Sequence, residues 1–146
     1  MFRNTADAKA DVERFIKRVV ATDIVWYLMS KKGTAGCPSN AEPEEGTEPA
    51  TVLLFFSDAA YARRAQSQSY RGYTSKSMSL FDFMYRWLPG MSRDRVLAGP
   101  NWTGDLIGLE IDPFEFREAL EAGMTQDHLQ RHQRLYEELS GASRKA

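Results

Sequence analysis

The longest uninterrupted apolar run in this chain covers residues 24–29 and is only six residues long. A helix needs about 20 apolar residues to cross a bilayer, so we expect no membrane span. The β-branched and aromatic residues of the run, bounded by Asp23 and Ser30, indicate a buried strand instead. Charges recur every few residues from Arg3 to Arg18, so we also expect no signal peptide and a cytoplasmic location.

The charges of the chain nearly cancel, because 19 basic residues are balanced by 20 acidic ones. This balance excludes a protein held on nucleic acid by bulk charge, and it excludes an acidic disordered chain. The length of 146 residues and the hydrophobic content of 42% are sufficient for one domain with its own core. The single cysteine, Cys37, excludes an internal disulfide framework.

Hydrophobic periodicity and capping residues predict alternating helices and strands. Helices are predicted over residues 7–22, 59–66, 80–88, 113–122 and 125–139. Strands are predicted over residues 24–29, 34–37, 51–56, 70–79, 96–98 and 106–111. Several links between strands are too short for helical crossovers, which favours an α+β fold with a mostly antiparallel sheet and helices packed against it.

Two local signals set the ends of the predicted helices. Pro89 and Gly90 are expected to stop the third helix, and Asp112 followed by Pro113 is expected to begin the fourth. Between the second and third predicted strands, the acidic, proline-containing residues 41–50 are expected to form a mobile loop.

Short motifs dispersed along the chain resemble one family in their order. These are RFIKRV at 14–19, VW at 25–26, FFSDAAYA at 55–62, RWLPG at 86–90, AGPNW at 98–102 and LEIDP at 109–113. They resemble the uncharacterised bacterial family called domain of unknown function 2750 (DUF2750) over residues 10–120. The resemblance implies a small α+β domain and no activity, because none is attached to the family. We therefore predict one domain over 1–123 and a C-terminal helical extension and tail over 124–146.

The two histidines of the chain, His128 and His132, are spaced four residues apart on the last predicted helix. This spacing puts both rings on one helix face, as in helical zinc sites. However, Leu129 stands where a metalloprotease helix has its glutamate, and Asp127 points elsewhere. Neighbouring glutamine and arginine residues indicate a solvated face. We therefore predict no metal ligand and no cofactor.

Other catalytic patterns also have structural explanations. Cys37 precedes a proline and is followed by no helix N-terminus that would lower its pKa, which indicates a structural thiol. Glu110 and Asp112 are explained by a strand face and a helix cap, and Gly99, Gly104 and Gly108 by turns and bulges. No catalytic residue is predicted. The alternative is a small hydrolase or transferase whose acidic residues converge from separate elements.

A basic stretch over residues 59–81 contains no acidic residue and has tyrosines interleaved with its charges. Its basic side chains are Arg63, Arg64, Arg71 and Lys76. Basic and aromatic residues together can neutralise phosphates and stack on bases, so a weak nucleic-acid binder is a further alternative.

The three tryptophans are the remaining candidates for ligand or partner binding. Trp26 and Trp87 are expected to belong to the core. Trp102 lies beside Asn101 in a polar loop, where it either folds back over the sheet or is displayed for a partner. We take Asn101 and Trp102, with Trp26 and Trp87, as candidate binding residues. The leading hypothesis is a non-catalytic module that binds a protein or a small ligand.

The last predicted helix carries a narrow apolar stripe. Its members are Leu129, His132, Leu135, Tyr136 and Leu139. An isolated helix of about fifteen residues is marginal in water, so this helix must dock on its own domain or on a second copy. A homodimer through residues 125–139 is therefore a possible partner arrangement.

Overall fold

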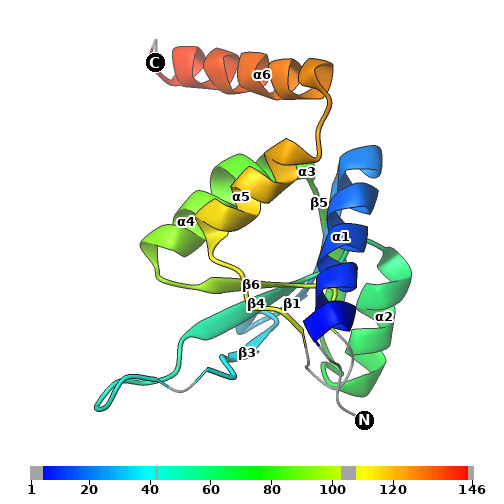
Figure 1. Cartoon of the computed structure of the whole chain (residues 1–146), viewed down its shortest axis with the longest axis vertical. Coiled ribbons are helices and arrows are strands. Elements are labelled where there is room, and N and C mark those ends of the chain that lie inside the picture. Colours follow the sequence, from blue (N-terminus) through cyan, green and yellow to red (C-terminus); the bar gives the residue numbers. More distant parts are fainter. Residues whose placement is uncertain (1–4, 42, 103–107, 145–146) are drawn as a thin grey trace.

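The computed structural model describes residues 5–41, 43–102 and 108–144. The first half contains α1 (Thr5–Thr22), β1 (Ile24–Ser30), β2 (Gly33–Thr34), β3 (Gly36–Pro38), β4 (Thr51–Phe55) and α2 (Ala59–Gln68). The second half contains β5 (Thr74–Ser79), α3 (Leu80–Asp82), the π-helix η1 (Phe83–Trp87), α4 (Leu88–Arg93), β6 (Leu97–Pro100), α5 (Pro113–Ala122) and α6 (Gln126–Arg144). Figure 1 shows their arrangement.

The strands form two small sheets in the orders β2-β1-β5 and β3-β4-β6. All pairs are antiparallel except β4 with β6, which run parallel with Leu54 opposite Gly99. The two sheets are joined where the backbones of Trp26 and Phe56 exchange two hydrogen bonds of 2.8 Å each. The predicted α+β fold with a mostly antiparallel sheet and packed helices is confirmed.

Two hydrophobic cores hold the helices on the sheets. The first is lined by α1, α5 and the helices after β5, with Phe15, Phe83 and Phe116 fully buried at its centre. These rings pack edge-on or tilted, with centroids 5.4 to 6.3 Å apart. The second core lies under α2 and includes Phe56 and Trp102.

Pro89 and Gly90 do not stop the third predicted helix, so that prediction is wrong. The chain passes from α3 through η1 into α4 and stays helical to Arg93. In the π-helical segment the Leu88 N–H bonds to the carbonyl of Phe83, five residues back. Pro89 follows this segment directly, and the helix continues through it and Gly90.

Other boundaries also differ from the predictions: the predicted strand 34–37 is divided between β2 and β3 in different sheets, and the predicted strand 70–79 begins only at Thr74. The second strand of the predicted hairpin falls partly on residues 103–107, which lie outside the described residues. Among the described residues of that strand, Ile111 pairs with Ala98 through an isolated antiparallel bridge. The tail expected after residue 139 is helical, because α6 continues to Arg144. The acidic segment between β3 and β4 projects away from the rest of the fold (Figure 1).

No helix among the described ranges is both long and apolar enough to span a bilayer.

Candidate metal centre

Asp23 occupies the junction between α1 and β1 in a left-handed backbone conformation, with φ of 60°. Its N–H donates to the Val19 carbonyl at 2.8 Å, and its own carbonyl accepts from the Leu80 N–H at 2.8 Å. Glycine is the usual residue where a helix ends in this conformation, and aspartate is among the few others that tolerate it. Two backbone hydrogen bonds therefore fix the position of the backbone from which the Asp23 side chain projects.

His128 and His132 lie on the first two turns of α6, on the face that meets the body of the protein. Thr125 caps this helix, because its Oγ1 accepts from the His128 N–H at 3.1 Å. Both histidines are buried, with exposed fractions of 6% and 7%. The solvated face expected from the sequence is therefore wrong for these two residues. Glutamine and arginine occupy the other sides of the same helix.

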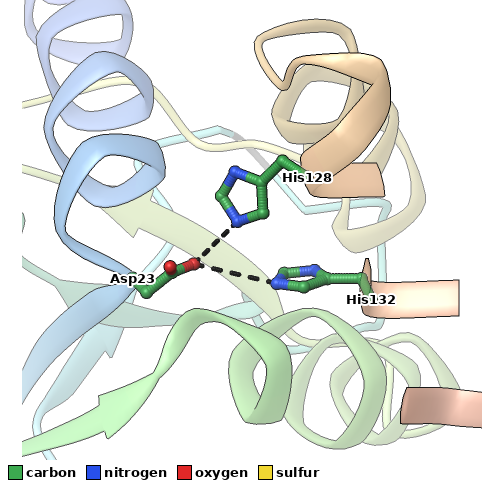
Figure 2. Close-up of side chains that lie close together, drawn as sticks. All are labelled: Asp23, His128 and His132. Atoms are coloured by element: carbon green, nitrogen blue, oxygen red, sulfur yellow. Dashed lines mark hydrogen bonds and ion pairs between the residues drawn. The ribbon is translucent and has the colours of Figure 1, made fainter. Parts of the chain in front are cut away.

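The two imidazoles converge on one carboxylate oxygen, although Asp23 and His128 are 105 residues apart. Nε2 of His128 lies 2.8 Å from Oδ1 of Asp23, and Nε2 of His132 lies 3.7 Å from the same oxygen. Figure 2 shows both rings turned toward Asp23 from α6. The side chain of Asp23 is 49% exposed, so the cluster opens to solvent on the carboxylate side.

The His132 ring is held by packing rather than by hydrogen bonds. Its edge contacts are with Phe81 and Tyr85, at centroid distances of 5.7 and 5.9 Å. Its Nδ1 is buried without a hydrogen-bond partner among the described residues. Burial and the neighbouring His128 lower the pKa of His132, with burial the larger cause. Near neutral pH this ring is therefore a neutral imidazole, which is the form that binds metal.

These three side chains fit the donor set of a divalent transition-metal ion. Their ligand atoms all lie within 4.8 Å of one another. In a tetrahedral site with bonds of about 2.1 Å, neighbouring ligand atoms are about 3.4 Å apart, a value between the 2.8 and 3.7 Å that separate Oδ1 of Asp23 from the two Nε2 atoms. Two imidazoles and one carboxylate suit Zn²⁺ and similar ions, and the exposed side leaves room for a water ligand.

The sequence indicates the two histidines of this cluster but not its carboxylate. The spacing of His128 and His132 is visible in it, but the acid considered was Asp127, which pairs with Arg131 at 3.4 Å instead. Asp23 is separated from the histidines by most of the chain, and no local pattern joins them. The sequence has one local feature at this position: an aspartate stands where glycine is the usual residue at the end of a helix.

The structure places Trp102 inside the protein, which decides between its two predicted positions. The side chain is 3% exposed, and its Nε1 donates to the Leu109 carbonyl at 2.8 Å. Asn101 is 8% exposed, accepts from the Ser57 N–H at 2.9 Å and donates to the Ser57 hydroxyl at 3.0 Å. These contacts join β6 to the end of β4. A displayed tryptophan is therefore not the arrangement observed.

Gly99 and Gly108 make room for the indole of Trp102. A Cβ on Gly99 would lie 2.7 Å from its Nε1, and one on Gly108 would lie 2.3 Å from its Cδ1. Neither glycine has a positive φ. Gly99 lies within β6 opposite Leu54, and Gly108 lies at a bend. The close approach of the ring gives a reason for glycine at both positions, whereas Gly104 lies outside the described residues.

Trp26 and Trp87 are partly buried and pack against the two cores, as expected. Trp87 lies against Phe55 and Tyr27, with centroids 5.8 and 5.0 Å away, and Trp26 packs on the second core. Their rings thus support the sheets.

The basic side chains of the 59–81 stretch are exposed on α2, the following turn and β5. They are Arg63, Arg64, Arg71 and Lys76. The tyrosine nearest the centre of the stretch, Tyr70, is 7% exposed and donates its hydroxyl to the Gly36 carbonyl at 3.1 Å. Burial raises the pKa of Tyr70 to about 12. This ring is therefore part of the second core, and nucleic-acid binding by the stretch stays an untested alternative.

The carboxylates of Glu110 and Asp112 have separate structural partners. Asp112 caps α5 by accepting from the N–H groups of Phe114 and Glu115 at 3.0 and 3.2 Å. Glu110 accepts from the Ser39 hydroxyl and from the Asn40 N–H. The cap confirms the predicted start of this helix.

Cys37 is expected to react slowly with alkylating reagents. Burial, and secondarily the carboxylate of Glu110, raise the pKa of its thiol. A smaller fraction is then thiolate at pH 8, so iodoacetamide should label the folded chain several-fold more slowly than the chain unfolded in urea. Labelling followed by mass spectrometry measures both rates, and Cys37→Ser is the blank. Equal rates in the two states would contradict the burial of this thiol.

The described structure is thus an α+β domain with a cluster of two histidines and one carboxylate. A family model described as protein of unknown function (DUF2750) matches residues 12–120. The chain belongs to this family, and the predicted resemblance is confirmed. Comparisons with curated proteins and with solved structures found no match. Asp23 lies within the matched range, and His128 and His132 lie beyond it.

Proposed function

We propose that this chain is a cytoplasmic, non-catalytic module that binds a divalent transition-metal ion, with Zn²⁺ the best fit, through Asp23, His128 and His132. The proposed ligand is thus a metal ion at this cluster, in place of a protein or small ligand bound at Asn101 and Trp102. Bound metal would fasten α6 to the junction of α1 and β1, two parts of the chain that no other described ion pair connects.

The observation that carries the proposal is the second histidine. A purely structural contact between α6 and Asp23 needs only His128, whose 2.8 Å pair with the carboxylate is already complete. His132 is directed at the same oxygen from 3.7 Å, too far for a hydrogen bond. Its Nδ1 is buried without a hydrogen-bond partner among the described residues, so a hydrogen bond positions this ring at neither nitrogen. A shared metal ion would satisfy its Nε2 and neutralise the carboxylate at the same time.

The position of Asp23 also favours a cation. The last carbonyls of α1 leave partial negative charge at this end of the helix, and α1 has no basic residue in its last turn. A carboxylate placed there is disfavoured unless positive charge lies beside it. A divalent ion supplies that charge while His132 stays neutral.

The test is a titration of the metal-free full chain with Co²⁺, whose visible absorption reports coordination by nitrogen and oxygen ligands. We expect one Co²⁺ per chain, displaced by Zn²⁺. Asp23→Asn and His132→Phe are expected to weaken binding by roughly 100-fold or more, because ligand loss exceeds the tenfold to 100-fold effects of outer-shell changes. His132→Phe preserves an aromatic ring among Phe81 and Tyr85, so the fold should survive.

Asp127→Asn is the matched control. It removes an exposed carboxylate next to His128 on the same helix, and it should leave Co²⁺ binding unchanged. Binding of Zn²⁺ should also raise the melting temperature of the wild type, with about 2.7 kcal/mol of added stability at a free-ion concentration of 100 Kd. A wild type that binds neither ion, or variants that bind as tightly as it does, would refute the proposal.

A further inference from the structure

The second half of α6 carries an apolar face that the described chain covers only at one edge, where the Tyr136 ring packs against Tyr85 at a centroid distance of 5.6 Å. Leu135, Tyr136 and Leu139 are 39%, 52% and 42% exposed, and they are three of the five exposed large hydrophobic side chains among the described residues. They continue the helix face on which His128 and His132 are buried. From this continuity we infer that α6 pairs with α6 of a second copy of this chain, in an antiparallel two-fold arrangement.

Helical spacing shows why these residues form one surface. Positions 128, 132, 135 and 139 recur at intervals of three and four residues and therefore share one side of the helix. The first two face the body of the protein. Every described residue from 133 to 139 is exposed, so the same side emerges from the body with its leucines unpaired. Figure 1 shows α6 lying at one end of the fold, with the C-terminus at its free end.

The charged side chains in the second half of α6 are complementary to those of the same segment in a second copy. In an antiparallel pair centred at residue 137, Leu135 of one copy lies opposite Leu139 of the other. Arg134 then comes within one turn of Glu138 of the second copy, on the same edge of the contact. The two-fold axis repeats this pairing, so each copy gives and receives one ion pair. Neither Arg134 nor Glu138 has an ion pair within the described chain.

The expected dimer is weak, because three exposed side chains on each copy make a contact at or below the small end of specific interfaces. We expect dissociation constants on the order of micromolar, so that dilution separates the copies. Residues 134–139 hold none of the proposed metal ligands, so this inference and the proposed metal site can fail independently.

The test uses two charge reversals in the full chain, Arg134→Glu and Glu138→Arg, followed by sedimentation velocity. Each variant alone places like charges across the two-fold contact, and we expect its dissociation constant to rise at least tenfold. Mixing the two variants should restore the dimer, because every cross-chain pair is then attractive. Pairing within a single helix cannot produce this result, since mixing does not change either chain.

Leu139→Ser should also raise the dissociation constant, whereas Phe114→Ser, which alters a 56% exposed side chain on α5, should leave it unchanged. Circular dichroism and a thermal melt of each variant check that the fold is preserved. A wild type that stays monomeric at concentrations of hundreds of micromolar would overturn the inference. So would a mixture of the two charge variants that stays monomeric.

Discussion

Trp102→Ala is expected to lower the free energy of unfolding by about 3–5 kcal/mol, the range for removal of a buried large aromatic side chain. The indole is 3% exposed and lies where Cβ atoms on Gly99 or Gly108 would collide with it. Alanine would leave a cavity between those two glycines. It would also leave the Leu109 carbonyl without the hydrogen bond that the indole N–H donates. Urea unfolding monitored by circular dichroism measures the loss.

Two further variants separate the causes of this loss. Trp102→Phe keeps most of the buried ring but not the N–H, so it should cost less than alanine. Phe114→Ala removes an exposed ring and should stay within about 0.5 kcal/mol of the wild type. If Trp102→Ala were as stable as the wild type, the indole would not be packed in the core, and its role as a displayed binding residue would return.

Asn101→Ala is expected to cost about 2–5 kcal/mol for two reasons that add. The buried N–H of Ser57 loses its acceptor, which costs about 1–3 kcal/mol. Asn101 also has a φ of 52°, and a residue with a Cβ and no local polar group is disfavoured there by about 1–2 kcal/mol. The same urea experiment measures this variant.

Asn101→Gly isolates the backbone contribution. It removes the same amide side chain, but glycine adopts the left-handed conformation without penalty. We therefore expect Asn101→Gly to be more stable than Asn101→Ala. Equal stabilities would mean that the conformation at this position costs nothing, and wild-type stability in both would mean that the contact with Ser57 is not formed.

The parts of the fold predicted from sequence are those determined by neighbouring residues. The helix after Asp112 follows from a cap, a proline and a glutamate within four positions, and β1 follows from a bounded apolar run. The prediction that Pro89 ends a helix is wrong because the usual effect of a proline depends on the α-helical hydrogen bond that it breaks. A π-helical segment immediately before it, stabilised by Phe83 and Met84 in the first core, changes that pattern and cannot be inferred from the proline itself.

The candidate site shows the same division. The spacing of His128 and His132 is local and visible, but their burial depends on where α6 lies against the rest of the chain. Asp23 becomes a neighbour only after α1, β5 and α6 have been placed in space. Likewise, Gly99 and Gly108 flank Trp102 because of the fold, and sequence alone offers the commoner explanation of turns.

The parallel pairing of β4 with β6 has a consequence for how the protein acquires its structure. Hairpins such as β3–β4 join residues that are close in the chain. By contrast, α2, β5 and the helices that follow separate β4 from β6, so these two strands can pair only after all of those elements have been synthesised. Closing so long a loop is entropically costly and slows folding. We expect β4 to keep an unpaired edge until synthesis has passed residue 100, which makes this stretch of nascent chain the one most exposed to misassociation and to chaperones.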